Sequence, residues 1–325
     1  MALAKQGTTM NAMISALVLA FLATAEALPA NPPAQAQEAP GRTDSQDAIV
    51  VEGLREPTKK EVRALASAIT PGVSFYEPVA RFRDPVCFGT AGLSRPMLEE
   101  IGHRLAWDAH EAGIPLAGDK CTPNILIFFG EDGRKELAQI RTHQSWLFGN
   151  LSTYEINRVI NQPGPVHAWN VSELQSSEGY KLQTNTHGVS TLYTQIASMI
   201  VLPIRRNMKF SAMMIDRSSL AGLTTTQIAD YVAMRMLART RPEGANDRDT
   251  ILKLFDPASR DRPSEMTSFD RGYLKSIYTG ADNQRSSTKM HLIAQRIVAD
   301  ARKDRNGHAK DGAGAGNEPS PPPRD

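Results

Sequence analysis

The chain has 325 residues, and 37 Lys and Arg residues against 35 Asp and Glu residues leave a formal net charge of +2. This balance excludes a nucleic-acid-binding protein held mainly by bulk positive charge, and 22% charged with 41% hydrophobic residues excludes a highly charged disordered chain and a polytopic membrane protein. Two cysteines are too few for a disulfide-rich small scaffold or a cysteine-rich zinc module.

The N-terminus, residues 1–25, is predicted to be a cleaved secretory signal peptide. Lys5 precedes an apolar run from Ala12 to Ala25 that is too short to span a bilayer core about 30 Å thick. Small residues at 23–25 and at 34–36 offer two cleavage sites. An uncleaved anchor and a cytosolic chain with a misleading start are the alternatives. We therefore expect a periplasmic or secreted protein with no transmembrane span after cleavage.

Composition divides the remaining chain into one domain and two disordered segments. Residues 26–46 are rich in Pro, Ala and Gln, and residues 306–325 are rich in Gly and Pro. Neither segment has enough bulky apolar residues to offset the entropy lost on ordering, so we expect a disordered linker and a disordered tail. Residues 47–305 are predicted to form a single globular domain.

The first half of this domain is predicted to alternate helices and strands. Thr58 with Glu61 opens a helix that ends at Thr70, and Ser94 caps a second that ends at Gly113. In the second helix the residues expected to face inward are Met97, Leu98, Ile101, Leu105 and Ala109. Further elements are expected as a buried strand at 125–129, a helix through Leu137, Ile140 and Leu147, a short helix capped by Ser152, and a half-exposed strand over 165–174 at a sheet edge.

Cys87 and Cys121 lie in this first half, and in an oxidising compartment they are expected to form one structural disulfide. A free reactive thiol or a metal pair are the alternatives, although neither cysteine has a C-x-x-C partner or a nearby histidine.

The second half is predicted to be mainly helical. Strands are expected at 196–204 and 210–215, separated by a solvated basic turn that contains Arg205, Arg206 and Lys209. A helix capped by Thr224 with Gln227 follows, and further helical segments are expected near 251–255, over 267–278 and over 287–302. The fold class is therefore α+β or α/β, with a mixed sheet flanked by helices.

The sequence contains no complete catalytic motif of the kinds considered below. The sequence has no H-E-x-x-H, G-x-S-x-G, Walker A or G-x-G-x-x-G motif. Glu100-x-x-His103 is a single step of a kind that di-iron bundles need twice, and Ser286-x-x-Lys289 lacks the companion motifs of penicillin-binding folds. Helix capping explains Ser286 better than nucleophilic catalysis does. We expect no catalytic residues, no metal site and no cofactor.

A candidate groove is predicted between the 166–174 strand and the 224–239 helix. The strand contributes His167, Trp169 and Asn170, and the helix contributes Asp230, Tyr231 and Arg235. An edge strand offers unpaired backbone groups to an extended peptide. The alternatives are a tryptophan packed under a neighbouring helix, and a structural ion pair of Asp230 with Arg235 or Arg217.

Residues 213–238, 251–255 and 266–278 resemble a group of exported alphaproteobacterial proteins of unknown function, and residues 49–55 are similar to the mature N-termini of sphingomonad-type exported proteins. The order of elements is also distantly similar to that of minimal zinc-dependent peptidases. In those peptidases the helix that matches 225–238 carries H-E-x-x-H, whereas here it contains no histidine. The resemblance implies a retained cleft without the metal chemistry.

The sequence is compatible with three functions. The first is a non-catalytic binding domain on a degenerate peptidase-like scaffold, with an extended peptide or an envelope protein as its partner and no nucleic acid. The second is a hydrolase with dispersed catalytic residues, and the third is a purely structural envelope protein.

Overall fold

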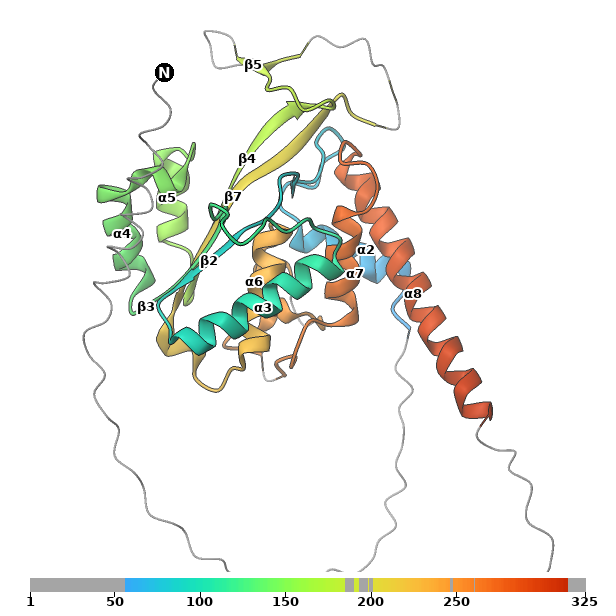
Figure 1. Ribbon diagram of the computed structural model, residues 1–325. Helices are drawn as coiled ribbons and strands as arrows, with labels where there is room; N and C mark the ends of the chain where they lie inside the picture. Colours follow the sequence, from blue (N-terminus) through green and yellow to red (C-terminus); the bar gives the residue numbers. More distant parts are fainter. Residues whose placement is uncertain are drawn as a thin grey trace, which may run out of the picture. The chain divides into compact units, whose positions relative to one another are not determined.

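The computed structural model describes residues 56–184, 190–192, 198, 201–245, 248–259 and 261–314. The predicted signal peptide (1–25) and linker (26–46) lie outside these residues, as do residues 47–55 and 315–325. Glu56–Asp325 group as one unit. The fold is α/β, as the alternation of elements predicted, and it consists of a mixed sheet with helices on both faces (Figure 1).

Strand β7 organises the sheet. It pairs in parallel with β3 and, nearer its start, with β1, while β4 runs antiparallel to it and β2 pairs in parallel with β3. The strands are β1 (Arg81–Phe82), β2 (Phe88–Ala91), β3 (Ile125–Gly130), β4 (Val166–Ser176) and β7 (Ile204–Asp216), and a separate antiparallel pair is formed by β5 (Gln183–Thr184) and β6 (Ser190–Thr191). Within the described residues β4 pairs with one strand only, so it is the edge strand that the sequence predicted.

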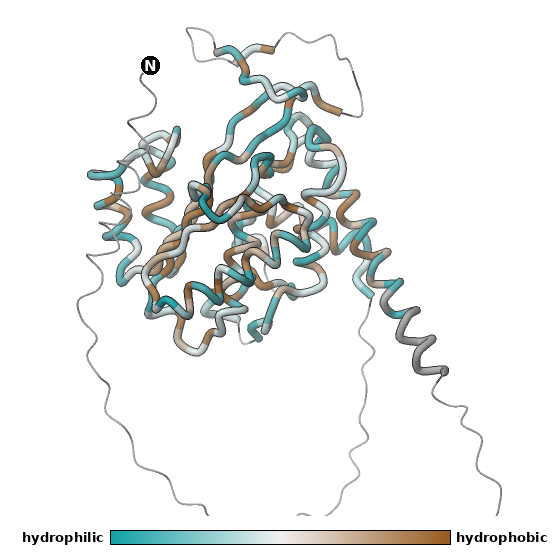
Figure 2. The backbone as a smooth tube through the Cα atoms, in the orientation of Figure 1, coloured by the Kyte–Doolittle hydropathy of each residue, from teal (hydrophilic) through white to brown (hydrophobic). Residues whose placement is uncertain are grey.

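Alternate residues of β3 and β7 enter two separate cores. Ile127 and Met213 belong to the larger core, whereas their neighbours Leu126 and Met214 belong to the smaller one. This follows from the two-residue period of a strand, because successive side chains point to opposite faces. Hydrophobic residues accordingly concentrate along these central strands (Figure 2).

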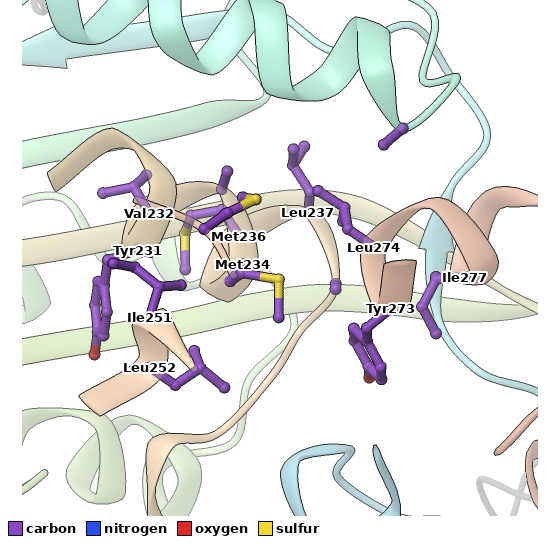
Figure 3. Close-up of a cluster of buried hydrophobic side chains, with 14 of the residues drawn as sticks. Tyr231, Val232, Met234, Met236, Leu237, Ile251, Leu252, Tyr273, Leu274 and Ile277 are labelled. Atoms are coloured by element: carbon purple, nitrogen blue, oxygen red, sulfur yellow. The ribbon is translucent and has the colours of Figure 1, made fainter. Parts of the chain in front are cut away.

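The two cores are covered by different helices. The smaller core is covered by α4 (Gly133–His143), α5 (Thr153–Ile160) and the 3-10 turn η1 (Ser145–Phe148). The larger core is built by α2 (Lys59–Ile69), α3 (Arg95–Glu111), α6 (Thr225–Leu237), α7 (Ser268–Tyr278) and α8 (Ser286–Gly314). Figure 3 shows how α6 side chains meet the η4 turn (Ile251–Lys253) and α7, with Tyr231 and Tyr273 fully buried. All regular elements described after β7 are helical, which confirms the predicted helical second half.

Capping explains where four of these helices begin. Thr58, Ser152, Thr224 and Thr267 each form a complete capping box with the residue three positions later. Such a cap contributes about 1 kcal/mol. Ser94 occupies the N-cap position of α3 but makes no side-chain cap hydrogen bond. The prediction that Met97 faces inward is wrong, since it is 37% exposed.

Several predicted boundaries are also wrong. The basic segment 205–209 is part of β7 and not a turn, because its side chains find partners on distant segments. The helix predicted to reach Leu147 ends at His143, and Leu147 lies in η1. The predicted strand 196–204 falls largely outside the described residues. Finally, α8 continues to Gly314, past residue 306 where the disordered tail was predicted to begin.

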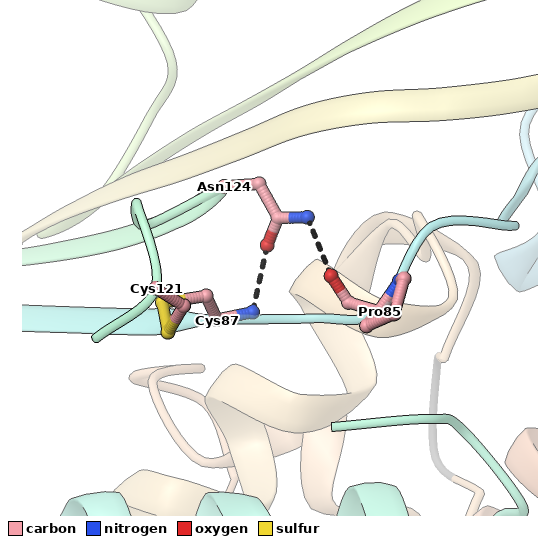
Figure 4. Close-up of a disulfide and its surroundings, with 4 residues drawn as sticks. All are labelled: Pro85, Cys87, Cys121 and Asn124. Atoms are coloured by element: carbon pink, nitrogen blue, oxygen red, sulfur yellow. Dashed lines mark hydrogen bonds between the residues drawn. A yellow bond between two sulfur atoms is a disulfide. The ribbon is translucent and has the colours of Figure 1, made fainter. Parts of the chain in front are cut away.

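The predicted disulfide joins Cys87 and Cys121, whose Cα atoms are 6.1 Å apart. It ties the start of β2 to the loop before β3 (Figure 4). Asn124 reinforces this connection, since its Oδ1 accepts from the Cys87 backbone N–H at 2.8 Å and its Nδ2 donates to the Pro85 carbonyl at 3.1 Å. The confirmed bond fits a secreted protein. None of the described helices combines the length and apolar character needed to cross a membrane.

Candidate anion-binding site

The predicted groove residues of β4 lie mostly on the side of the sheet that faces α4 and α5. Trp169 is 3% exposed, packs against Phe148, and donates from Nε1 to the Leu147 carbonyl at 2.9 Å. His167 is also buried, with Nδ1 3.0 Å from the Val159 carbonyl. Both side chains therefore stabilise the smaller core.

The other predicted groove residues lie toward α6. Asn170 donates to Ser211 Oγ, which donates in turn to the Met236 carbonyl of α6. Tyr231 and Arg235 are buried and hydrogen-bonded to each other, with Arg235 Nη1 donating to the Tyr231 hydroxyl at 3.1 Å. The sheet thus separates Trp169 and His167 from these side chains, and none of the six predicted residues lines either cavity described below.

Asp230, the remaining predicted residue, is fully buried and pairs with Arg104 of α3, not with Arg235 or Arg217. Arg104 donates to both Asp230 oxygens, at 2.7 and 3.0 Å, and the Met266 backbone N–H donates to Asp230 as well. Asp108 is buried beside this pair, and burial together with the negative charge of Asp230 raises the pKa of Asp108 to about 8. Paired carboxyl groups can serve acid–base chemistry, but these two are 3% and 0% exposed and lie between packed helices. The Arg104–Asp230 ion pair therefore links α3 to α6, and Asp108 is buried beside it.

The structure also separates the two residues of the Ser286-x-x-Lys289 motif. Ser286 Oγ accepts from the Ser74 backbone N–H and donates to the Ser74 carbonyl, both at 2.7 Å. Lys289 Nζ donates to the Thr279 carbonyl at 2.5 Å. The two residues line different cavities, so the motif does not form a nucleophile with its base.

A cavity of about 140 Å³, hereafter the arginine cavity, lies where the ends of several elements meet. It is bounded by the C-terminal ends of α2 and α6, the loop that leads to β1, the β7 strand and the first residue of α8. Its lining consists of Thr70, Pro71, Gly72, Glu77, Pro78, Val79, Ala80, Arg206, Ala238, Arg239 and Ser286. Two arginines and one carboxylate therefore share a small space.

The backbone of Arg239 is unusual. It has φ of 49°, and it is the one non-glycine residue with positive φ in the described part of the chain. It follows Ala238, the C-cap of α6, so it occupies the position where helices commonly have glycine. A left-handed conformation costs a side-chain-bearing residue about 1–2 kcal/mol. A strained arginine at a cavity is a pattern typical of functional positions.

The charge environment of Arg239 is also unusual. Burial lowers the pKa of Arg239, and the positive charge of Arg206 lowers it further, while the negative charges of Glu77 and Glu155 oppose this shift. Glu77 is already engaged, since its Oε2 lies 3.2 Å from Arg206 Nη2. Arg239 itself makes no hydrogen bond or ion pair to a described residue. The cavity therefore holds a partly buried cation that makes no direct hydrogen bond or ion pair with any residue that the structure describes.

These features favour binding of an oxyanion. A guanidinium presents its N–H donors in a planar fork that matches phosphate and carboxylate oxygens. An anion between Arg206 and Arg239 would offset both the repulsion between them and the cost of burying Arg239. The neutral donors of the lining are already used internally, because Thr70 Oγ1 is bonded to the Ala66 carbonyl and the Tyr273 hydroxyl.

Within the described residues, no group of three or more His, Cys, Asp or Glu side chains is placed to hold a metal ion. Comparison of the chain with protein-family models, curated proteins and solved structures found no match.

Sequence reasoning missed both cavity arginines. The sequence predicts a solvated turn at Arg206, although this residue lies in β7 and reaches Glu77 across 129 positions of the chain. Arg239 carries one usable signal, which is that the predicted α6 helix has no glycine at its C-terminal end. Nothing in the sequence shows that these two arginines meet.

Proposed function

We propose that this chain is an exported, non-catalytic binding protein that recognises a phosphate group in the arginine cavity. The observation that carries the proposal is Arg239, a strained and partly buried cation that shares the cavity with a second arginine and makes no direct hydrogen bond or ion pair with a described residue. Export is supported by the N-terminal apolar run and by the Cys87–Cys121 disulfide.

A phosphate group fits this charge arrangement better than an extended peptide does. An extended peptide requires a groove, whereas the candidate β4–α6 groove residues are occupied in packing and hydrogen bonds. A dianionic phosphate would compensate both arginines, of which Arg206 alone forms an ion pair with a carboxylate among the described residues.

Isothermal titration of the purified chain with inorganic phosphate tests this proposal. We expect binding at one site, and we expect Arg206→Met to abolish it because the variant removes half of the guanidinium pair. Lys209→Met is the matched control, since Lys209 lies on the same strand but is 41% exposed and paired with Asp84. If both variants weaken binding equally, the interaction is bulk attraction and the proposed site is wrong.

A hydrolase remains the competing function, and the buried Asp108–Asp230 pair is the observation that favours it. It requires substrate to reach two carboxyl groups that are almost fully covered. A screen of phosphate-ester, peptide and carboxyl-ester substrates with wild type and Asp230→Asn separates the two functions. Turnover that the substitution removes would contradict a non-catalytic protein.

A further inference from the structure

A second cavity, of about 370 Å³, lies between the end of α7 and the first turns of α8. Its lining consists of Ser276, Thr279, Gly280, Gln284, Lys289, Leu292, Gln295 and Arg296. Two of these residues are cationic and none is acidic. Lys289 is only 5% exposed, so a charged ammonium is largely removed from water at this cavity.

The charge of Lys289 is poorly compensated. Nζ donates to the Thr279 carbonyl, and the structure records no partner for its other donors among the residues it describes. The carboxylate whose charge acts on Lys289, Asp282, is held by Arg83 at 3.1 Å and by Arg205 at 3.7 Å. Arg296, which lines the cavity from the same helix, makes no ion pair with a described residue.

Two neutral polar atoms in the lining also lack partners. Ser276 is 5% exposed and its Oγ makes no hydrogen bond, and the same holds for Oε1 of Gln284. A buried polar atom without a partner costs about 1–3 kcal/mol, so such atoms are rare unless something else binds them. Here they share one cavity with an uncompensated ammonium. The lining thus offers cationic donors for an anion and, at Gln284, an acceptor for a hydroxyl or amine hydrogen.

We infer that this cavity is a second binding site, independent of the arginine cavity, for a small hydroxylated carboxylate. The carboxylate pairs with Lys289 and Arg296, and the hydroxyl bonds with Ser276 and Gln284. Leu292 supplies an apolar wall for the carbon skeleton. A simple inorganic anion would satisfy the cations but has no carbon skeleton to pack against Leu292.

The affinity should depend on pH in one direction. Burial lowers the pKa of Lys289 to about 8, with further lowering by Arg81 and Arg296 and an opposing effect of Asp282. Bound carboxylate stabilises the protonated form, so binding takes up protons near and above pH 8. Binding should therefore be strongest below pH 8 and should weaken as the pH rises beyond it.

Isothermal titration with L-malate, succinate and inorganic phosphate at pH 7 tests the inference. We expect L-malate to bind at one site and succinate, which lacks the hydroxyl, to bind about fivefold more weakly, as the loss of one net hydrogen bond implies. Ser276→Ala should narrow that difference between the two acids, because the malate hydroxyl then keeps only its bond to Gln284. Lys289→Met should abolish malate binding, and Arg239→Asn should leave it unchanged because Arg239 lines the other cavity.

Circular dichroism establishes that each variant is folded, and if Lys289→Met is not, Arg296→Gln takes its place because Arg296 is only half-buried. Three results would each overturn this site. They are the absence of binding heat with either acid, an unchanged malate affinity in the variant of Lys289 or Arg296, and displacement of malate by phosphate with equal affinity. Loss of phosphate binding in Arg239→Asn with intact malate binding would support both sites, so failure of one is distinguishable from failure of the other.

Discussion

Replacing Arg239 with asparagine should make the fold more stable in the absence of a ligand. Arg239 has φ of 49°, and asparagine adopts this region more readily, so the substitution relieves about 1 kcal/mol of backbone strain. It also removes a partly buried guanidinium, a gain that is offset by the loss of packing along its methylene groups. The net expectation is an increase of about 1 kcal/mol in the free energy of unfolding, or roughly 2–4 °C in Tm.

Bound phosphate should make the wild-type chain more stable than the Arg239→Asn variant. At a phosphate concentration ten times its Kd, the wild-type chain should gain about 1.4 kcal/mol by mass action, whereas the variant should gain nothing. Urea unfolding followed by circular dichroism, with and without phosphate, measures both quantities. The variant should be the more stable protein in phosphate-free buffer and the less stable one at saturating phosphate.

Arg241→Asn is the matched control. Arg241 lies two positions further on in an extended conformation with φ of −124°, and its Nε donates to the Ala68 carbonyl at 2.9 Å. Its replacement relieves no strain and removes a hydrogen bond, so it should cost about 0.5–1.5 kcal/mol. The reasoning is refuted if Arg239→Asn destabilises the phosphate-free chain by 1 kcal/mol or more, or if phosphate stabilises both proteins equally.

Three further predictions concern the scaffold. Replacing both Cys87 and Cys121 with serine should lower the free energy of unfolding by about 3–4 kcal/mol, because the disulfide spans 34 residues, and a loss below 1 kcal/mol in urea unfolding would contradict this. The folded state keeps a proton on Asp108 up to about pH 8, whereas the unfolded state loses it near pH 3.8. The free energy of unfolding should therefore fall as the pH rises between these two values. Asp108→Asn should flatten this slope when unfolding is measured as a function of pH. Trp169→Ala should cost about 3–5 kcal/mol, since Trp169 is 3% exposed, whereas Trp146→Ala, at a site 49% exposed, should cost far less in the same assay.

The elements that could be predicted from the sequence are those set by local rules. The capping boxes at Thr58, Ser152 and Thr224 depend on residues three positions apart, so the sequence displays them directly. The run Ile125–Phe129 is apolar on both faces, as a strand buried between two layers requires.

The errors lie where tertiary contacts override local character. Arg206 and Lys209 have the composition of a turn, but as part of β7 they pair with Glu77 and Asp84 from distant segments. The resemblance to peptidases and the expected edge strand predict one groove that contains both Trp169 and Tyr231. Only the sheet register shows that they belong to different cores.

The candidate cavities could not be predicted for a related reason. Each is formed where the ends of several elements converge, and the residues that matter are ordinary ones in sequence: two arginines in one case, and a lysine, a serine and a glutamine in the other. Their significance comes from missing partners, which only the folded structure displays.

A crystal structure of the purified chain grown with inorganic phosphate would address the arginine cavity most directly. The expected result is a phosphate with oxygens within hydrogen-bond distance of the guanidinium groups of both Arg206 and Arg239, and an Arg239 backbone that keeps its positive φ. An empty cavity at a saturating phosphate concentration, or an Arg239 side chain paired instead with a carboxylate of the chain itself, would contradict the proposed function.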